Sequence, residues 1–428
     1  MLILIAATFL LAYAAIALEH PLKINKSATA LIAAGLMWTL FSFAPPPGPH
    51  GVGELLGEKL QETAAIIFFL IGAMTIVEVI DAHGGFEVIT RRIKAKRLRS
   101  LLWVIGVVTF LLSAVLDNLT TTIVMIALVR KLLKNHEDRL FFAGIIVIAA
   151  NAGGAWSPIG DVTTTMLWIG GQITTLSIMK SLLVPSLVSL AIPLLATSFF
   201  LKGKVVPPAP EKGAKGPMTS PFEKKFIFFL GIGSLVFVPV FKTVTHLPPW
   251  LGILLALGIL WLASELMHRH KHEDDKAHLT LGRALRRIDM SSVTFFIGIL
   301  LAVATLSATG QLPAMARWLD NAIGNQTLIV LVIGLVSAVV DNIPLVAASM
   351  GMYPLSTYPA DHFIWEFLAY CAGTGGSILV IGSAAGVAAM GLEKIHFFWY
   401  VKRVSLLALL GYFAGAGAYV LQYRLLHH

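Results

Sequence analysis

Long uninterrupted runs of apolar residues dominate the chain, and short polar segments separate them. Residues 2–18, 27–43, 226–241 and 251–263 are almost continuous Leu, Ile, Ala, Val and Phe. Runs of this length approach the roughly 20 residues that an α-helix needs to cross the hydrocarbon core of a bilayer. Outer-membrane barrels instead show alternating segments of about 10 residues. The pattern therefore predicts an all-α polytopic membrane protein.

Composition and charge support this class. Of the 428 residues, 57% are hydrophobic and 13% are charged, whereas soluble proteins carry about 25% charged residues. The net charge of +9 is typical of basic cytoplasmic loops, so we expect membrane lipid and not nucleic acid as the surroundings. The single cysteine, Cys371, excludes an internal disulfide. Residues 1–17 lack the Lys or Arg of a signal peptide, so 2–18 is expected to be a retained helix.

The sequence contains two copies of one unit, at a spacing near 225 residues. Matching segments occur in the same order in both copies: Ser113–Asn118 with Ser337–Asn342, Asn151-Ala-Gly153 with Cys371-Ala-Gly373, and Ile159-Gly160 with Ile381-Gly382. Internal repetition of this kind predicts a duplicated architecture. We expect a first repeat over 1–205, a cytoplasmic linker over 206–221 and a second repeat over 222–428.

The positions of Lys and Arg predict that the two copies are inverted. Basic loops 81–100 and 130–139 flank the apolar stretch 101–129, and both stay cytoplasmic only if that stretch turns back as a re-entrant hairpin. When residues 326–353 are also taken as a re-entrant hairpin, the loops on one side of the membrane hold 27 of the 32 Lys and Arg residues. Each repeat then has five membrane-crossing segments, an odd number. Both termini are expected outside, in a bacterial cytoplasmic (inner) membrane.

Four acidic residues lie in apolar surroundings, namely Glu78, Asp117, Asp161 and Asp341. A charged side chain at the centre of a membrane helix costs roughly 2.5–3.5 kcal/mol, so such residues normally line an ion path or pair with one another. An Asp can also cap a helix at a hairpin turn, which would explain Asp117 and Asp341 singly. It explains less well why both copies have an Asp-Asn pair. Glu78 has no acidic counterpart, and it either relays protons or pairs with a basic neighbour.

Residues 151–165 predict one discontinuous helix in the first repeat. The segment reads Asn-Ala-Gly-Gly-Ala-Trp-Ser-Pro-Ile-Gly-Asp-Val-Thr-Thr-Thr, and interrupted helices at membrane depth line cavities or are buried in protein. Its carbonyl, hydroxyl and carboxylate oxygens are ligands that hard cations prefer. The second repeat has similar glycines but Ser383 in place of Asp161. We therefore expect one cation site nearer the first repeat, with Asp341 and Asn342 contributing from the second.

These motifs resemble the NhaD-type sodium/proton antiporters of the ion transporter superfamily, and the resemblance covers nearly the whole chain. It implies a secondary transporter, not an enzyme, that exchanges Na⁺ or Li⁺ for H⁺ without a cofactor. It also implies a scaffold that forms a homodimer and a transport unit that slides. The resemblance assigns the ion site to Asp117, Asn118, Asn151, Asp161, Thr163, Thr164, Ser337, Asp341 and Asn342, with Na⁺ at Asp117 and Asp161. Further candidates beside these motifs are Thr120, Ser157, Ser377, Ser383 and Glu78.

A mechanism follows from general chemistry. Burial disfavours a free carboxylate charge, so Asp117 and Asp161 can each hold a proton or share Na⁺, and one displaces the other. Two alternatives stay open. The first is a carrier of the same fold for arsenite or a dicarboxylate, although Asp at both hairpin tips repels anions. The second is an intramembrane aspartyl hydrolase, because paired carboxylates can act as acid and base. The His-rich segment 268–278 is interpreted as a solvated loop.

Overall fold

The computed structural model describes residues 1–44, 51–90, 93, 95–208, 219–269 and 279–426. Regular structure in these residues is helical, apart from an isolated β-bridge between Arg97 and Lys204. The prediction of an all-α polytopic membrane protein is confirmed, because several of these helices are long and apolar enough to span a bilayer.

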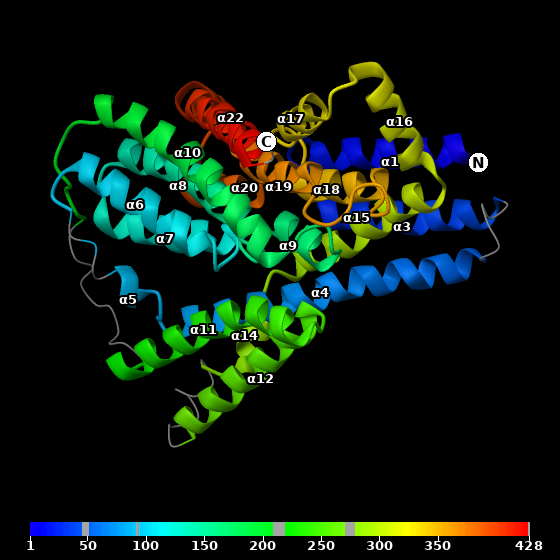
Figure 1. Ribbon diagram of the computed structural model, residues 1–428. Coiled ribbons are helices and arrows are strands. Elements are labelled where there is room, and N and C mark those ends of the chain that lie inside the picture. Colours follow the sequence, from blue (N-terminus) through cyan, green and yellow to red (C-terminus); the bar gives the residue numbers. More distant parts are fainter. Residues whose placement is uncertain (45–50, 91–92, 94, 209–218, 270–278, 427–428) are drawn as a thin grey trace.

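The helices form two bundles (Figure 1). The first, which we call the scaffold bundle, consists of α1 (Leu2–Ala17), α3 (Lys26–Ser42), α4 (Val52–Ala82), α11 (Pro221–Thr245), α12 (Pro249–His268) and α15 (Met290–Ala308). The second, the site bundle, consists of α6 (Leu98–Ser113), α7 (Asn118–Leu132), α8 (His136–Ala155), α9 (Val162–Ile169), α10 (Thr175–Phe200), α17 (Gln326–Val336), α18 (Asn342–Met352), α19 (Phe363–Gly375), α20 (Ala384–Glu393) and α22 (Leu406–Leu426). Each bundle contains helices from both predicted repeats.

Short elements connect the longer helices. They are α2 (Glu19–Leu22), α5 (Glu87–Thr90), α14 (Leu281–Arg287), α16 (Gln311–Ile323), α21 (Phe397–Tyr400) and the π-helical segment Val401–Ser405. Helix α16 was not expected from the sequence. It ends at Gly324, which has a φ of 66°, and it makes an angle of 115° with α17. The left-handed backbone at Gly324 allows this sharp change of direction.

Seven helices in the described part of the chain are long and apolar enough to cross a membrane, or up to eight if α16 and α17 form one bent span. Among the predicted crossings, α1 and α3 have only 16 and 17 residues. Helices α8 and α19 are each followed by an interruption and then by a short helix, α9 or α20. The predicted discontinuous helices are therefore present, whereas the number of ten crossings stays a prediction.

The two basic loops beside α6 and α7 lie at the same end of the molecule. The N–H of Val205 donates to the carbonyl of Lys96 (3.0 Å), and the N–H of Lys134 donates to the carbonyl of Val206 (2.9 Å). One extended segment therefore contacts both loops. This arrangement requires the chain to turn back between α6 and α7, as the hairpin interpretation of 101–129 expects.

Equivalent serines join the helices in the two predicted repeats. The Ser113 hydroxyl donates to the carbonyl of Ala150 (2.6 Å), and the Ser337 hydroxyl donates to the carbonyl of Ala372 (3.0 Å). Both bonds tie the end of a hairpin helix, α6 or α17, to the helix that comes before the interruption, α8 or α19.

Close contacts at two glycines show that the sequence alignment of the two repeats must be shifted by two residues in this segment. A Cβ at Gly153 would overlap the carbonyl oxygen of Phe110, and a Cβ at Gly375 would overlap that of Gly334. The residue equivalent to Gly153 is thus Gly375 and not Gly373. The sequence match failed here because the glycine-rich stretch 373–376 offers several registers, and packing against α17 selects one.

Candidate functional site

Four helices begin around one small cavity. Asp117, Asp161 and Asp341 are the N-cap residues of α7, α9 and α18, and Ser383 is the N-cap residue of α20. Their side chains accept hydrogen bonds from backbone N–H groups at distances of 2.8, 3.0, 3.3 and 3.2 Å, respectively. A helix N-terminus carries partial positive charge, which favours a carboxylate there. The capping explanation considered for Asp117 and Asp341 is therefore correct, and Asp161 is a cap as well, but these capped ends also face a shared cavity.

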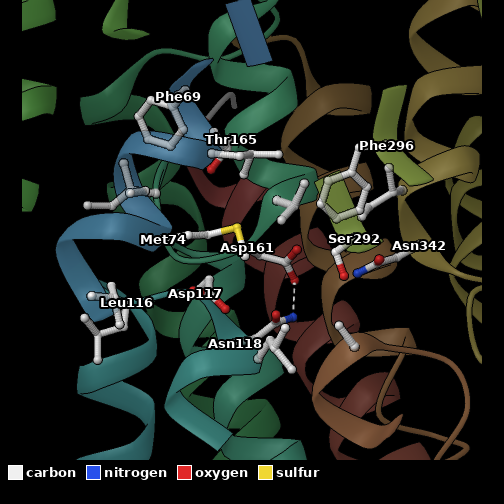
Figure 2. A pocket seen from close by; sticks show the side chains of 18 of the residues that line it. Phe69, Met74, Leu116, Asp117, Asn118, Asp161, Thr165, Ser292, Phe296 and Asn342 are labelled. Carbon is white, nitrogen blue, oxygen red and sulfur yellow. Dashed lines mark hydrogen bonds between the residues drawn. The ribbon is translucent and has the colours of Figure 1, made fainter. Parts of the chain in front are cut away.

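The cavity has a volume of about 70 Å³, which is room for a few water molecules. Its charged lining residues are Lys26, Asp117, Asp161 and Asp341. Figure 2 shows Asp161 and Asn118 facing each other, with Ser292 and Asn342 on the opposite side of the cavity. Apolar side chains complete the wall, among them Phe69, Leu70, Met74, Val77 and Phe296.

Asp161 is buried, with 2% of its surface exposed. Its Oδ2 accepts a hydrogen bond from Asn118 Nδ2 (2.9 Å), and its Oδ1 accepts from the N–H and the hydroxyl of Thr163 (both 3.0 Å). These donors are all neutral. Neutral donors offset part of the cost of burying a carboxylate charge, but no charge of opposite sign in the described part of the chain pairs with it. Asp161 therefore favours partners that remove this charge, namely a proton or a small cation.

Amide side chains connect Asp161 to the second repeat. Asn118 Nδ2 donates to Asn151 Oδ1 (2.9 Å) as well as to Asp161. Asn151 Nδ2 in turn donates to Ser383 Oγ (3.0 Å). Both Asn118 and Asn151 are buried. The chain of bonds fixes the orientation of both amides, so that Asn118 presents a donor to Asp161.

The two hairpin-tip carboxylates have different partners. Asp117 accepts hydrogen bonds from the N–H (2.8 Å) and the hydroxyl (2.6 Å) of Thr120, its own helix neighbour. Asp341 forms an ion pair with Lys26, with 3.1 Å between Nζ and Oδ2. The tip of the second repeat is thus neutralised by a cation of the protein, whereas no Lys or Arg in the described part of the chain forms an ion pair with the tip of the first repeat.

Most of the predicted site residues meet at this cavity, and others have different positions. Asp117, Asn118, Asp161, Asp341 and Asn342 line it. Asn151, Thr163 and Thr120 form hydrogen bonds with these lining residues, and Ser383 accepts a hydrogen bond from Asn151. Thr164 is buried, but it is not among the lining residues. The Ser337 hydroxyl donates to the backbone of α19, and Ser157 accepts from the N–H of Ile159 within the first interruption. The Ser377 hydroxyl donates to the carbonyl of Thr374 in the last turn of α19.

Glu78 lies near the cytoplasmic end predicted for α4 and pairs with Arg287 (3.1 Å between Oε1 and Nη1). Glu78 was expected either to relay protons or to pair with a basic neighbour, and the structure shows the second of these.

The first histidine of segment 268–278 is not solvated. His268 is 2% exposed, and its Nε2 lies 2.9 Å from Nε2 of the buried His83. The interpretation as a solvated loop is therefore wrong for this residue, because the last turn of α12 packs against the end of α4. Residues 270–278 lie outside the described part of the chain.

Three polar residues of the cavity were not among the predicted site residues. One of them, Thr165, ends the segment 151–165, and the other two lie outside every motif. Lys26 lies in the polar segment between the apolar runs 2–18 and 27–43, but it is the first residue of α3 and lines the cavity. Ser292, near the start of α15, also lines the cavity. Neither residue lies inside an apolar run or a glycine-rich motif, so the sequence carries no local signal for them.

Comparisons with known proteins agree with the motifs. Residues 13–373 match the family model described as "Citrate transporter" (CitMHS). The chain is 50% identical over 98% of its length to "Sodium/proton antiporter 1" of Arabidopsis thaliana, covering 72% of that protein. It is 47% identical over 97% of its length to "Sodium/proton antiporter 2" of the same plant, covering 98% of it. It is 31% identical over 97% of its length to "Na(+)/H(+) antiporter NhaD" of Alkalimonas amylolytica, covering 89% of it.

Proposed function

The chain belongs to the NhaD-type sodium/proton antiporters of the citrate transporter (CitMHS) family, and we propose that it exchanges Na⁺ or Li⁺ for H⁺ at the cavity of Asp117 and Asp161. One observation carries the proposal. Asp161 is buried, its hydrogen-bond donors are neutral, and it lines a cavity together with a second carboxylate, Asp117. Such a pair gains most from binding a small cation or protons.

Exchange follows from competition for the same oxygen atoms. An alkali cation at the cavity requires ionised Asp117 and Asp161, whereas protonation neutralises them and removes the attraction for the cation. The amide of Asn118 stabilises the ionised form of Asp161 through the bond to Oδ2. Because the protonated and the cation-bound forms exclude each other, movement of one ion is coupled to movement of the other.

The same geometry disfavours a citrate or dicarboxylate substrate. Helix N-termini are general binding sites for anions, and four of them face this cavity. Three are already capped by carboxylates of the protein, Asp117, Asp161 and Asp341. An organic anion would have to displace these side chains and would meet their charge. An alkali cation requires no such displacement.

Further parts of the proposal concern the setting of the transporter. We place it in a cytoplasmic membrane, with both termini outside, because loops on one predicted side hold 27 of the 32 Lys and Arg. Na⁺, Li⁺ and H⁺ are its transported ions, and it needs no further cofactor. A homodimer through the scaffold bundle is proposed on the resemblance to the antiporter family.

Asp161→Asn tests the assignment. The amide keeps the size of the side chain but cannot exchange a proton for a cation, so Na⁺-dependent dissipation of ΔpH in everted vesicles should be lost. The matched control is Asp81→Asn, since Asp81 is exposed at the end of α4 and does not line the cavity. The control should retain exchange. If the Asp161→Asn variant exchanges Na⁺ for H⁺ as fast as the wild type does, the assignment of Asp161 to the ion site is refuted.

The substrate is tested in the same vesicles. Addition of Na⁺ or Li⁺ should collapse the ΔpH of wild-type vesicles, whereas citrate as its choline salt should not. A collapse of ΔpH that requires citrate would replace the antiport proposal with anion transport.

A further inference from the structure

Among the described residues, Lys26 is the one cationic side chain that lines the cavity of the proposed ion site. It lines the cavity, and its Nζ lies 3.1 Å from Asp341 Oδ2. The side chains of Lys26 and Asp341 are 26% and 16% exposed, so solvent reaches the pair only in part. The Lys26 ammonium also lies 4.5 Å from the centre of the buried Phe295 ring. An ammonium that is enclosed in this way interacts with Asp341 more strongly than an exposed one would.

The position of Lys26 is not explained by helix stability. Lys26 is the first residue of α3, and a cation at a helix N-terminus is disfavoured by the helix dipole. Hydrogen bonds of the neighbouring residues nevertheless hold Lys26 at this position. Asn25 caps α3 and donates to the hydroxyl of Ser291 (3.2 Å), and the hydroxyl of Ser27 donates to the carbonyl of Ser291 (2.7 Å). The start of α3 is thus bound to the start of α15, and Lys26 projects from this junction.

The pair connects the two bundles. Lys26 belongs to the scaffold bundle, and Asp341 is the hairpin tip of the second predicted repeat, 315 residues further along the chain. The equivalent tip residue of the first repeat, Asp117, accepts its hydrogen bonds from Thr120 and forms no ion pair with any cation among the residues that the structure describes. The two tips have the same Asp-Asn sequence, but the carboxylate charge is neutralised by a lysine at the second tip and not by Lys26 at the first.

We propose that Lys26 is a tethered cation that neutralises Asp341 and so restricts the cavity to one alkali cation, bound at Asp117 and Asp161. The inference rests on the proposed antiport function. In this arrangement the Lys26 ammonium takes the place that a second Na⁺ would occupy at the second tip. With Lys26 paired, the cavity presents two uncompensated carboxylates. Without it, the cavity presents three, and a transported cation is held more tightly and released more slowly.

Equilibrium binding of ²²Na⁺ to the purified full-length protein in detergent tests the proposal. Lys26→Gln removes the ammonium, so the Kd for Na⁺ should fall on the order of tenfold because the cavity gains net negative charge. Asp341→Asn leaves Lys26 unpaired, so the Kd should rise by a similar factor. The double variant Lys26→Gln/Asp341→Asn removes both charges and should return the Kd to within about threefold of wild type. Lys26→Arg should bind Na⁺ like wild type.

Lys23→Gln is the matched control, because Lys23 is exposed three residues before Lys26 and does not line the cavity. Its Kd should not change. The double variant also serves if a single variant fails to fold, since it leaves no unpaired charge. A double variant that binds Na⁺ tenfold more weakly than wild type would make Asp341 a ligand of the ion and overturn the proposal.

Other outcomes separate this inference from the proposed function. Na⁺ binding by the wild type together with an unchanged Kd in Lys26→Gln overturns the role of Lys26 alone. A wild type that binds neither Na⁺ nor Li⁺ overturns the antiport proposal and the inference with it.

Discussion

At the scale of single residues, the side-chain amide of Asn118 is the group that connects the charge of Asp161 to the rest of the protein. It donates to Asp161 and to Asn151 from the same nitrogen. Asn118→Ala leaves two buried acceptors without this donor, which costs about 1–3 kcal/mol for each. We expect a lower melting temperature and a Na⁺ concentration for half-maximal exchange at least tenfold higher. Thermal unfolding and vesicle assays on the same preparation measure both effects.

A second asparagine provides the control. Asn325 is exposed and caps α17 through a bond from the N–H of Leu328. Asn325→Ala should cost about 1 kcal/mol of stability, as the loss of a cap does, but it should leave the Na⁺ dependence of exchange unchanged. If both variants change the Na⁺ dependence equally, the effect of Asn118 would be one of stability only.

Single residues of the site differ in how far the sequence could predict them. Asp117, Asp161 and Asp341 were predicted because a carboxylate within an apolar run has few uses in a membrane. Lys26 was not, because it adjoins a polar loop and has the local pattern of a cytoplasmic basic residue. Its partner lies 315 positions away, and only the packing of α3 against α15 brings the start of α3 to the hairpin tip.

At the scale of elements, two glycines determine how closely the interrupted helices approach the hairpins. A Cβ at Gly153 would overlap the carbonyl oxygen of Phe110 on α6, and one at Gly375 would overlap that of Gly334 on α17. Backbone cannot move aside as a flexible side chain can. We therefore expect Gly153→Ala and Gly375→Ala to lower the melting temperature and the exchange rate together, measured on purified protein and in vesicles.

Gly417 in α22 is the matched control for these two substitutions. A Cβ there would meet nothing within 4 Å, and Ala in a helix interior is more stable than Gly by about 0.5–1 kcal/mol. Gly417→Ala should therefore leave the melting temperature equal or higher. Equal losses at all three positions would show that the close contacts are not what limits substitution.

The elements themselves were predicted to different extents. Asp-Asn turns and glycine-rich interruptions predicted the breaks between α6 and α7, between α8 and α9, and in their second-repeat counterparts. Both signals are local. Helix α16 was missed because it is short and mixes polar with apolar positions, so that no apolar run marks it. The register of α19 against α17 was misplaced by two residues, since several consecutive glycines could fit.

At the scale of the whole molecule, basic segments gather at one end. Residues of the loops before α6 and after α7 both hydrogen-bond the segment that follows α10. From the second repeat, Glu393 joins the same end through ion pairs with Arg130 and Arg139 (2.6 and 3.3 Å). Contacts between loops so far apart in sequence support a single cytoplasmic face, as the distribution of Lys and Arg predicts.

The orientation is open to a direct test with reporter fusions. If each repeat crosses the membrane an odd number of times, the segment after α10 is cytoplasmic and the C-terminus is outside. Green fluorescent protein fused after Pro207 should fluoresce, and the same reporter after His428 should not, because it folds poorly once exported in an unfolded state. Alkaline phosphatase at the same two positions should give the reverse pattern, since it needs the oxidising exterior for its disulfides. Fluorescence at both positions would mean an even number of crossings in the second repeat, and the two copies would then be parallel and not inverted. The ion pair of Lys26 with Asp341 would persist in that case, but the two hairpin tips could no longer reach the cavity from opposite sides of the membrane.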